Sequence, residues 1–340
     1  MTVRRPRLRE ISEKAGVSKA TVDRVINNRS GVQEHTRRHV LSVAAALAGE
    51  SPDHPVRANA IALDFVIPDS RNAFMSQLIA DIEACARRRE DVRVTIHRLA
   101  DIGAEGVAAM LDRLGETSNA VGLIALDHHR VRATVRRLCE RGISIATIAS
   151  DIRNVPRAFY VGVDNRAAGR LAGHLTGRLL CKEKAKAALI LGARAYHGHE
   201  EREMGFRSVL RERFSGLTIV AEREVHEDVD TAYRETAAIV KEHPDLDAIY
   251  CIGAGQPGVA RALIDSGHAG SVVFLAHGLS DDTRGYLTEG IMDAVIDEDT
   301  SVMAEQAIER LVAARNGLPP DRLPAIRIQA IFPENIPVEP

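Results

Sequence analysis

The sequence predicts an all-α helix-turn-helix head joined to an α/β body of two Rossmann-like parallel-sheet subdomains. Three observations predict this architecture. The first 48 residues are basic and show short helical patterns, and the chain alternates strand and helix patterns from residue 60 onward. At 340 residues, the chain is also long enough to bury several hydrophobic cores.

Net charge is distributed unevenly along the chain. Residues 1–48 contain ten Lys and Arg residues and four Asp and Glu residues, which gives a net charge of +6. Because the whole chain carries −2, the remaining residues carry −8. A basic head on an acidic body favours a polyanionic partner for the head alone.

Hydropathy and cysteine usage indicate where the protein works. No stretch approaches the roughly 18 uncharged apolar residues of a membrane span, and the basic N-terminus is not followed by the apolar segment of a secretory signal. The four cysteines are far apart and follow no metal-ligand spacing, which is typical of reduced thiols. We therefore expect a cytoplasmic protein without a membrane segment.

The head, residues 1–48, shows three short helical patterns. The first covers residues 8–15, and Gly16 then permits a tight turn before Ser18, which is a good N-cap. The second pattern runs from Lys19 to about Asn27, and the third from about residue 33 to residue 47. A helix, a three-residue turn and a second helix form the geometry that places the second helix in the major groove of DNA.

The segment from Ala15 to Asn27 matches the pattern A-G-V-S-x-x-T-V-x-R-V-x-N. The head therefore resembles the N-terminal DNA-binding domain of the lactose/galactose repressor (LacI/GalR) family. The alternative is an ordinary three-helix bundle with a solvated basic face. The resemblance implies base-reading positions at Lys19, Ala20 and Arg24 and phosphate contacts at Ser18, Thr21, Asn27 and Thr36.

Two features depart from the family pattern. Asp23 stands where the family usually has serine, and its carboxylate would be repelled by phosphates. The linker, residues 49–59, lacks the family's A-R-x-L signature and contains Pro52 and Pro55. Since proline interrupts helices, a regular hinge helix is not expected in this linker.

The body, residues 60–340, consists of repeated strand–helix units. About eleven strands are too many for one compact sheet, so we expect two parallel sheets with helices on both faces. The predicted strands include residues 60–69, 92–99, 120–126, 143–148, 187–191, 218–225, 248–252 and 272–276. The predicted helices include residues 72–88, 106–114, 132–141, 167–180, 203–214, 231–241 and 259–266.

The segment of residues 160–175 resembles the first crossover of the type I periplasmic-binding-protein fold, which is the effector domain of the same repressor family. The resemblance implies three crossings, the later two near residues 290–293 and 316–320. The first subdomain would then hold about residues 60–162 and 291–317, and the second about residues 163–290 and 318–340. Ligands in such folds bind at the carboxyl ends of the strands.

A glycine turn follows the strand at residues 248–252. Gly253, Gly255 and Gly258 form G-x-G-x-x-G, the fingerprint of an NAD-dependent oxidoreductase, which is the alternative function. That chemistry needs an acid at the end of the next strand to hold a ribose, and His277 stands there instead. We therefore expect no cofactor and a glycine turn that shapes a ligand cleft, into which an aspartate at position 255 would intrude.

The effector site is predicted residue by residue from the resemblance, because sugar sites combine planar polar groups with an aromatic face. The candidates are Asn72, Phe74, Asp127, His128, Ser150, Asp151, Arg202, Gln256, His277 and Glu298. Phe74 could instead belong to the helix core, and Arg202 could be a solvated helix charge. His277 and Glu298 differ from the family's usual residues, which favours a polyol, a modified sugar or an amine-bearing ligand.

Catalytic and metal sites have little support in the sequence. The histidines at positions 128–129 and 197–199 lack a third ligand at a matching spacing, and no nucleophile–base–acid set is recognisable. The sequence thus predicts a non-enzymatic transcriptional repressor that binds operator DNA and a small sugar-like effector. Such heads bind as dimers, so we expect a homodimer, or a tetramer built from it, through helices at residues 74–89 and 301–314.

Overall fold

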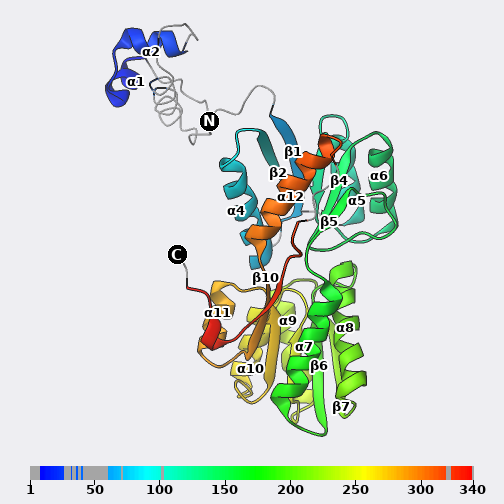
Figure 1. Ribbon diagram of the computed structural model, residues 1–340. Coiled ribbons are helices and arrows are strands. Elements are labelled where there is room, and N and C mark those ends of the chain that lie inside the picture. Colours follow the sequence, from blue (N-terminus) through cyan, green and yellow to red (C-terminus); the bar gives the residue numbers. More distant parts are fainter. Residues whose placement is uncertain are drawn as a thin grey trace. The chain divides into compact units, whose positions relative to one another are not determined.

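The computed structural model describes residues 8–26, 32, 36, 40, 60–69, 72–100, 103–318 and 323–338 (Figure 1). The head, up to Ala60, falls in one compact unit. The body from Ile61 falls in a second unit, except for its short segment Arg87–Arg93.

The head contains the predicted helix-turn-helix. Helix α1 covers Leu8–Ala15 and helix α2 covers Lys19–Ile26. Gly16 takes a φ of +64° between them, a conformation that favours glycine, and Ser18 caps α2 by accepting a hydrogen bond from the Thr21 N–H at 3.1 Å.

Among the described residues of the head, five buried apolar side chains pack together: Ile11, Ala15, Val22, Val25 and Val40. Val40 and Thr36 are helical, in agreement with the predicted third helix. The rest of that helix, Asn27 and the linker lie outside the described residues, so those predictions stay predictions.

The first sheet of the body has the strand order β2-β1-β3-β4-β5, and β1, β3, β4 and β5 pair in parallel. Its strands are β1 (Ile61–Pro68), β2 (Val92–Leu99), β3 (Ala120–Leu123), β4 (Ser144–Ile148) and β5 (Phe159–Val161). Its helices are α4 (Ala73–Arg87), α5 (Ala104–Leu114) and α6 (His129–Glu140), and α12 (Thr300–Arg315) also packs against it. Buried aliphatic residues such as Leu111, Leu123 and Val135 fill its core.

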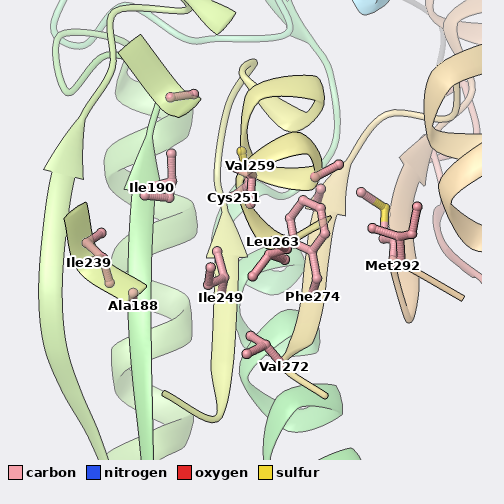
Figure 2. Packing of buried hydrophobic residues seen from close by; sticks show 14 of the residues in the cluster. Ala188, Ile190, Ile239, Ile249, Cys251, Val259, Leu263, Val272, Phe274 and Met292 are labelled. Atoms are coloured by element: carbon pink, nitrogen blue, oxygen red, sulfur yellow. The ribbon is translucent and has the colours of Figure 1, made fainter. Parts of the chain in front are cut away.

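The second sheet has the order β11-β10-β9-β8-β6-β7. Its strands are β6 (Ala185–Leu191), β7 (Leu217–Glu224), β8 (Ala248–Cys251), β9 (Val273–His277), β10 (Ala294–Glu298) and β11 (Ile328–Ile331). Its helices are α7 (Asn165–Leu180), α8 (His197–Arg213), α9 (Val229–Glu242), α10 (Gln256–Asp265) and α11 (Asp281–Thr288). Figure 2 shows Ile190, Ile249 and Phe274 of the strands packing with Ile239 and Leu263 of the helices.

One predicted crossing between the sheets is misplaced. Strand β10 pairs in parallel with β9, so it belongs to the second sheet and not to the first subdomain as expected. Its residues Ala294, Val295 and Ile296 are an apolar run that is buried in the second core. The chain therefore crosses at Asp299, which caps α12, instead of near residues 290–293. Strand β11 is antiparallel to β10, an edge arrangement that the expectation of purely parallel sheets did not include.

Candidate functional site

A cavity of about 350 Å³ lies in the body, beyond the carboxyl ends of strands from both sheets. We call its lining residues from Pro68 to Ser150 the first wall and those from Asn165 to Glu298 the second wall. Most of the expected effector residues line it: Asn72, Phe74, Ser150, Arg202, Gln256, His277 and Glu298. This location agrees with the rule that open α/β sheets bind ligands beyond the carboxyl ends of their strands.

The first wall presents partly exposed, uncharged side chains at the start of α4. Phe74 is half-buried and lines the cavity, so it is not confined to the helix core. Asn72 accepts a hydrogen bond from the Phe74 N–H at 2.9 Å, which leaves its Nδ2 to donate elsewhere. Ser150 follows β4 and accepts from the Gly198 N–H at 3.1 Å, at the start of α8.

Arg202 is the centre of the second wall. Its side chain is only 9% exposed, so it is not a solvated helix charge. Its Nη2 donates to Glu298 Oε1 at 2.6 Å, its Nε to Asn165 Oδ1 at 2.7 Å, and its Nη1 to the Ile252 carbonyl at 3.3 Å. These contacts fix the guanidinium in one orientation, and its positive charge is paired with the Glu298 carboxylate.

Close packing of α7 and α8 positions Arg202. A Cβ at Gly169 of α7 would collide with the Arg202 carbonyl oxygen and lie 2.8 Å from the Arg202 Cα. Only glycine at this position lets the two helices approach so closely. The approach brings Arg202 within hydrogen-bond distance of Asn165, the first residue of α7.

Glu227 lies in the second wall and was missed by the sequence reasoning. It follows β7 in a loop where His226 and Glu227 take φ values of 53° and 61°. Its Oε2 accepts from Asn72 Nδ2 at 2.9 Å and from the Ala254 N–H at 3.2 Å. The cluster of acids at the carboxyl end of this strand was the only signal in the sequence that could have indicated it.

The glycine turn accommodates this carboxylate. A Cβ at Gly253 would lie 2.6 Å from Glu227 Oε1, and a Cβ at Gly192 would collide with the same atom. Gly255, with φ +113°, faces Ala232 and Val225 instead of the cavity, so the expectation that a side chain there would enter the cleft is wrong. A Cβ at Gly258 would collide with the Val229 carbonyl oxygen, so this glycine serves helix packing.

Two buried histidines are held neutral in the second wall. Burial, with added repulsion from Arg202 and His199, places the pKa of His277 well below its usual value. Burial likewise lowers the pKa of His199, although the Glu227 carboxylate opposes this effect. His277 Nε2 lies 2.6 Å from the Tyr250 hydroxyl, and its carbonyl accepts from Gln256 Nε2 at 2.8 Å.

Asp127, an expected effector residue, does not line the cavity. It accepts hydrogen bonds from Arg132 Nε at 2.6 Å and Arg153 Nε at 3.1 Å. Burial acts to raise the pKa of Asp127, but the two arginines together outweigh it and hold that pKa below its ordinary value. Its carboxylate stabilises the loop before α6 and is not directed to a ligand.

His128 and Asp151 also lie outside the cavity lining. His128 is the N-cap of α6, where its Nδ1 accepts from the Arg130 N–H at 3.3 Å. Asp151 accepts from Thr147 Oγ1 at 2.6 Å and from Arg157. Each is directed into its own loop, so the effector roles expected for them have no geometric support.

Five of the residues expected to contact DNA are at least partly exposed on α2 or at its N-cap. Ser18, Lys19, Ala20 and Arg24 are exposed. Thr21 is partly exposed and lies 2.9 Å from Ser18, hydroxyl to hydroxyl. Asp23 is also partly exposed, so the departure from the family pattern noted above lies on the same helix.

The described residues contain neither a candidate metal site nor a helix that could span a membrane. No group of three or more His, Cys, Asp or Glu side chains is placed to hold a metal ion there. Within the same residues, no helix is long and apolar enough to cross a membrane.

The fold and the cavity define a ligand-binding body of the periplasmic-binding-protein type attached to a helix-turn-helix head. Comparison with protein families agrees: residues 61–319 match the periplasmic binding protein domain. Residues 7–48 match the lacI family of bacterial regulatory proteins. The chain therefore belongs to the family of the periplasmic binding protein domain, and its head matches the lacI family of bacterial regulatory proteins. These matches give the oxidoreductase alternative no support.

Individual relatives are distant. The chain is 28% identical to the HTH-type transcriptional regulator DegA of Bacillus subtilis over 214 aligned residues, and this alignment covers 60% of each chain. It is 27% identical over 274 residues to the ribose operon repressor of Halalkalibacterium halodurans, covering 77% of this chain and 75% of the repressor. A glucose-galactose binding protein from Geobacillus stearothermophilus shares the fold at a TM-score of 0.75 and 22% identity, covering 82% of this chain and 99% of that protein.

Proposed function

We propose that the protein is a transcriptional repressor whose affinity for operator DNA is controlled by a small sugar or sugar-like effector in the cavity. The observation that carries the proposal is the pairing of a lacI-family helix-turn-helix with a periplasmic-binding-type cavity in one chain. The alignment covers only about 60% of the first curated relative, DegA, so the relatives' own activities support this proposal without establishing it.

DNA binding is assigned to the exposed surface of α2. Arg24 would read a guanine because its guanidinium matches the O6 and N7 acceptors, and Lys19 and Ala20 would contact neighbouring base edges. Ser18, Thr21, Asn27 and Thr36 would contact phosphates and fix the register of the helix. A homodimer joined through α4 and α12 would place two heads on a pseudo-palindromic operator.

The effector is assigned to the cavity. Asn72, Ser150, Arg202, Gln256, His277 and Glu298 offer polar groups for hydroxyls, and Phe74 offers a ring face for the carbon skeleton. Closing the two walls on a ligand would change the placement of the heads in the dimer. Such linkage between effector and operator is worth about 1–3 kcal/mol, or roughly 5-fold to 150-fold in affinity.

Selection of binding sites from random-sequence duplex DNA with the full chain tests the DNA-binding part. We expect enrichment of a pseudo-palindrome and an affinity that falls steeply with salt, because several phosphate contacts each release a counterion. Arg24→Ala should lose about 1–3 kcal/mol on the selected site and relax the preference at one base pair. No enrichment together with a flat salt dependence would reject the proposal.

The same chain tests effector control. Sugars, polyols and sugar phosphates are screened by thermal shift, since a ligand that binds only the native state raises its stability. Each compound that stabilises the chain is then added to the selected DNA complex. A change in operator affinity of at least fivefold is expected, and Arg24→Ala should retain the thermal shift. Binding compounds that leave operator affinity unchanged would contradict the effector role.

A further inference from the structure

We propose that the effector is a polyhydroxylated amine, whose ammonium group binds at Glu227 in the second wall while its hydroxyl groups contact the first wall. This inference rests on the proposed function, because it specifies the chemical class of the ligand in the same cavity.

The first step is the charge of the cavity lining. Arg202 is the only Lys or Arg side chain among the lining residues, all of which are described. The carboxylates that line it are Asp69, Glu227, Asp228, Asp230 and Glu298. Carboxylates can also accept hydrogen bonds from the hydroxyl groups of a neutral sugar, but an excess of them in addition concentrates and holds a cation.

The second step is which of these charges the protein itself does not balance. Asp230 is paired with Arg261 at 3.1 Å, and Asp228 caps α9. In the second wall, the charges still to be balanced are therefore those of Glu227 and Glu298.

Arg202 already donates to Glu298 at 2.6 Å. His199 Nδ1 lies 3.8 Å from Glu227 Oε1, but burial lowers the pKa of His199, so the imidazole brings no positive charge. Burial lowers the pKa of His277 as well. Among the lining side chains, Arg202 is thus the only cation available to Glu227 and Glu298, and its hydrogen bond goes to Glu298.

The third step is an unsatisfied carboxylate oxygen on each of these two acids. Glu298 lines the cavity, and its side chain is only 7% exposed. Its Oε2 has no hydrogen-bond partner among the described residues. Glu227 Oε1 also has none within that part of the chain. Leaving charged oxygens buried and unpaired is costly, so neither carboxylate is fully compensated by its protein partners, and an ammonium group in the cavity beside them would lower that cost.

The fourth step is that the site is built for more than a bare cation. The described residues hold no group of three or more metal-ligating side chains. The first wall adds the half-buried ring of Phe74, the Asn72 amide and the Ser150 hydroxyl, all uncharged. A cavity of about 350 Å³ is at the small end for ligand pockets, which fits a compound of monosaccharide size.

Calorimetry on the full chain with matched pairs of compounds tests the inference. Each pair differs only in one hydroxyl replaced by an amine: D-sorbitol with 1-amino-1-deoxy-D-sorbitol, D-glucose with D-glucosamine, and D-galactose with D-galactosamine. We expect the amine of at least one pair to bind ten times more tightly or better than its neutral partner. Glu227→Gln should reduce this preference below threefold.

Controls separate the charge effect from loss of folding. Asp112→Asn removes an acid of α5 that pairs with Arg137 outside the cavity lining, and it should keep the full preference. Glu298→Gln provides a second variant if Glu227→Gln unfolds, and it should also weaken the amine preference. Cooperative urea unfolding of each variant, compared with the unsubstituted chain, confirms that its body folds.

The outcomes distinguish this inference from the proposed function. A neutral compound that binds as tightly as its amine partner would overturn the amine and leave the sugar effector standing. Tighter binding of 1,4-diaminobutane, which has no hydroxyl groups, would overturn the polyhydroxylated class. If no compound of any pair binds, both the amine and the sugar effector are rejected, while DNA binding is judged by its own selection experiment.

Discussion

The two walls of the cavity hold their side chains in different ways. In the first wall, Asn72 and Phe74 are half-buried at the start of α4, and apart from Asp69 the lining side chains there are uncharged. In the second wall, Arg202 and Glu298 are almost fully buried, ionisable and bonded to each other. We infer that the second wall is preorganised and selects the ligand by charge, whereas the first wall contributes adaptable contact area.

The largest effect is expected from Arg202→Met. This change removes the only guanidinium of the cavity and leaves the Glu298 carboxylate buried without its partner, which typically costs about 3–5 kcal/mol of stability. Arg166→Met is the matched control, because the Arg166 side chain is half exposed and lies 3.7 Å from Glu201. This variant should lose less than about 1 kcal/mol of stability. Urea unfolding of both variants measures the difference. Equal losses would show that the second wall is not held by this pair.

A smaller loss is expected from Gly253→Ala. The added Cβ would lie 2.6 Å from Glu227 Oε1 and 2.9 Å from the Gly192 Cα, and the backbone atom cannot move aside cheaply. Overpacking of this kind costs about 1–3 kcal/mol. Gly285→Ala provides the control: Gly285 lies within α11 with no atom within 4 Å of the added Cβ, so helix propensity should make this variant slightly more stable. Thermal unfolding that ranks the two variants in the opposite order would contradict the tight fit around Glu227.

The contrast between the walls also explains what the sequence could predict. Strand and helix periodicity located most elements of the body but did not predict β5, β10, β11 or α11, and the family motif located Arg202 and Phe74. Periodicity could not assign β10 to a sheet, because the apolar run at residues 294–296 fits either core and only the pairing with β9 decides. The expected crossing was therefore misplaced.

The candidate site was predictable only in part, for a similar reason. Strand ends identify residues near the cleft, but they do not tell where a charged side chain finds its partner. Asp127 and Asp151 end the expected strands and turn to Arg132 and Arg157 instead of the cavity. Glu227 depends on a loop of two positive-φ residues and on room left by Gly192, neither of which a motif records.

Phe74→Ala tests the first wall, where the effect on stability should be smaller than at Arg202 or Gly253. The ring is half-buried, so its removal should lower the free energy of unfolding by about 1 kcal/mol, less than full burial of the side chain would give. Loss of the ring face should weaken the tightest-binding compound of the calorimetric panel roughly threefold to tenfold. A loss of stability as large as that of Arg202→Met would show that the two walls are equally rigid.

The smallest effect concerns pH and belongs to the second wall alone, because all lining histidines are found there. Burial places the pKa of His277 well below its usual value, so below about pH 6.5 the unfolded chain binds a proton that the folded protein does not. The folded protein therefore has its full stability above that pH, and its free energy of unfolding decreases as the pH falls, by at most about 1.4 kcal/mol per pH unit.

His277→Gln should therefore flatten the decline in stability between pH 6.5 and 5.5, as measured by urea unfolding. His268→Gln, at a partly exposed position after α10 and outside the cavity lining, should keep the slope of the unsubstituted chain. An unchanged slope in His277→Gln would mean that this imidazole is protonated in the folded state, and the second wall would then carry a second positive charge.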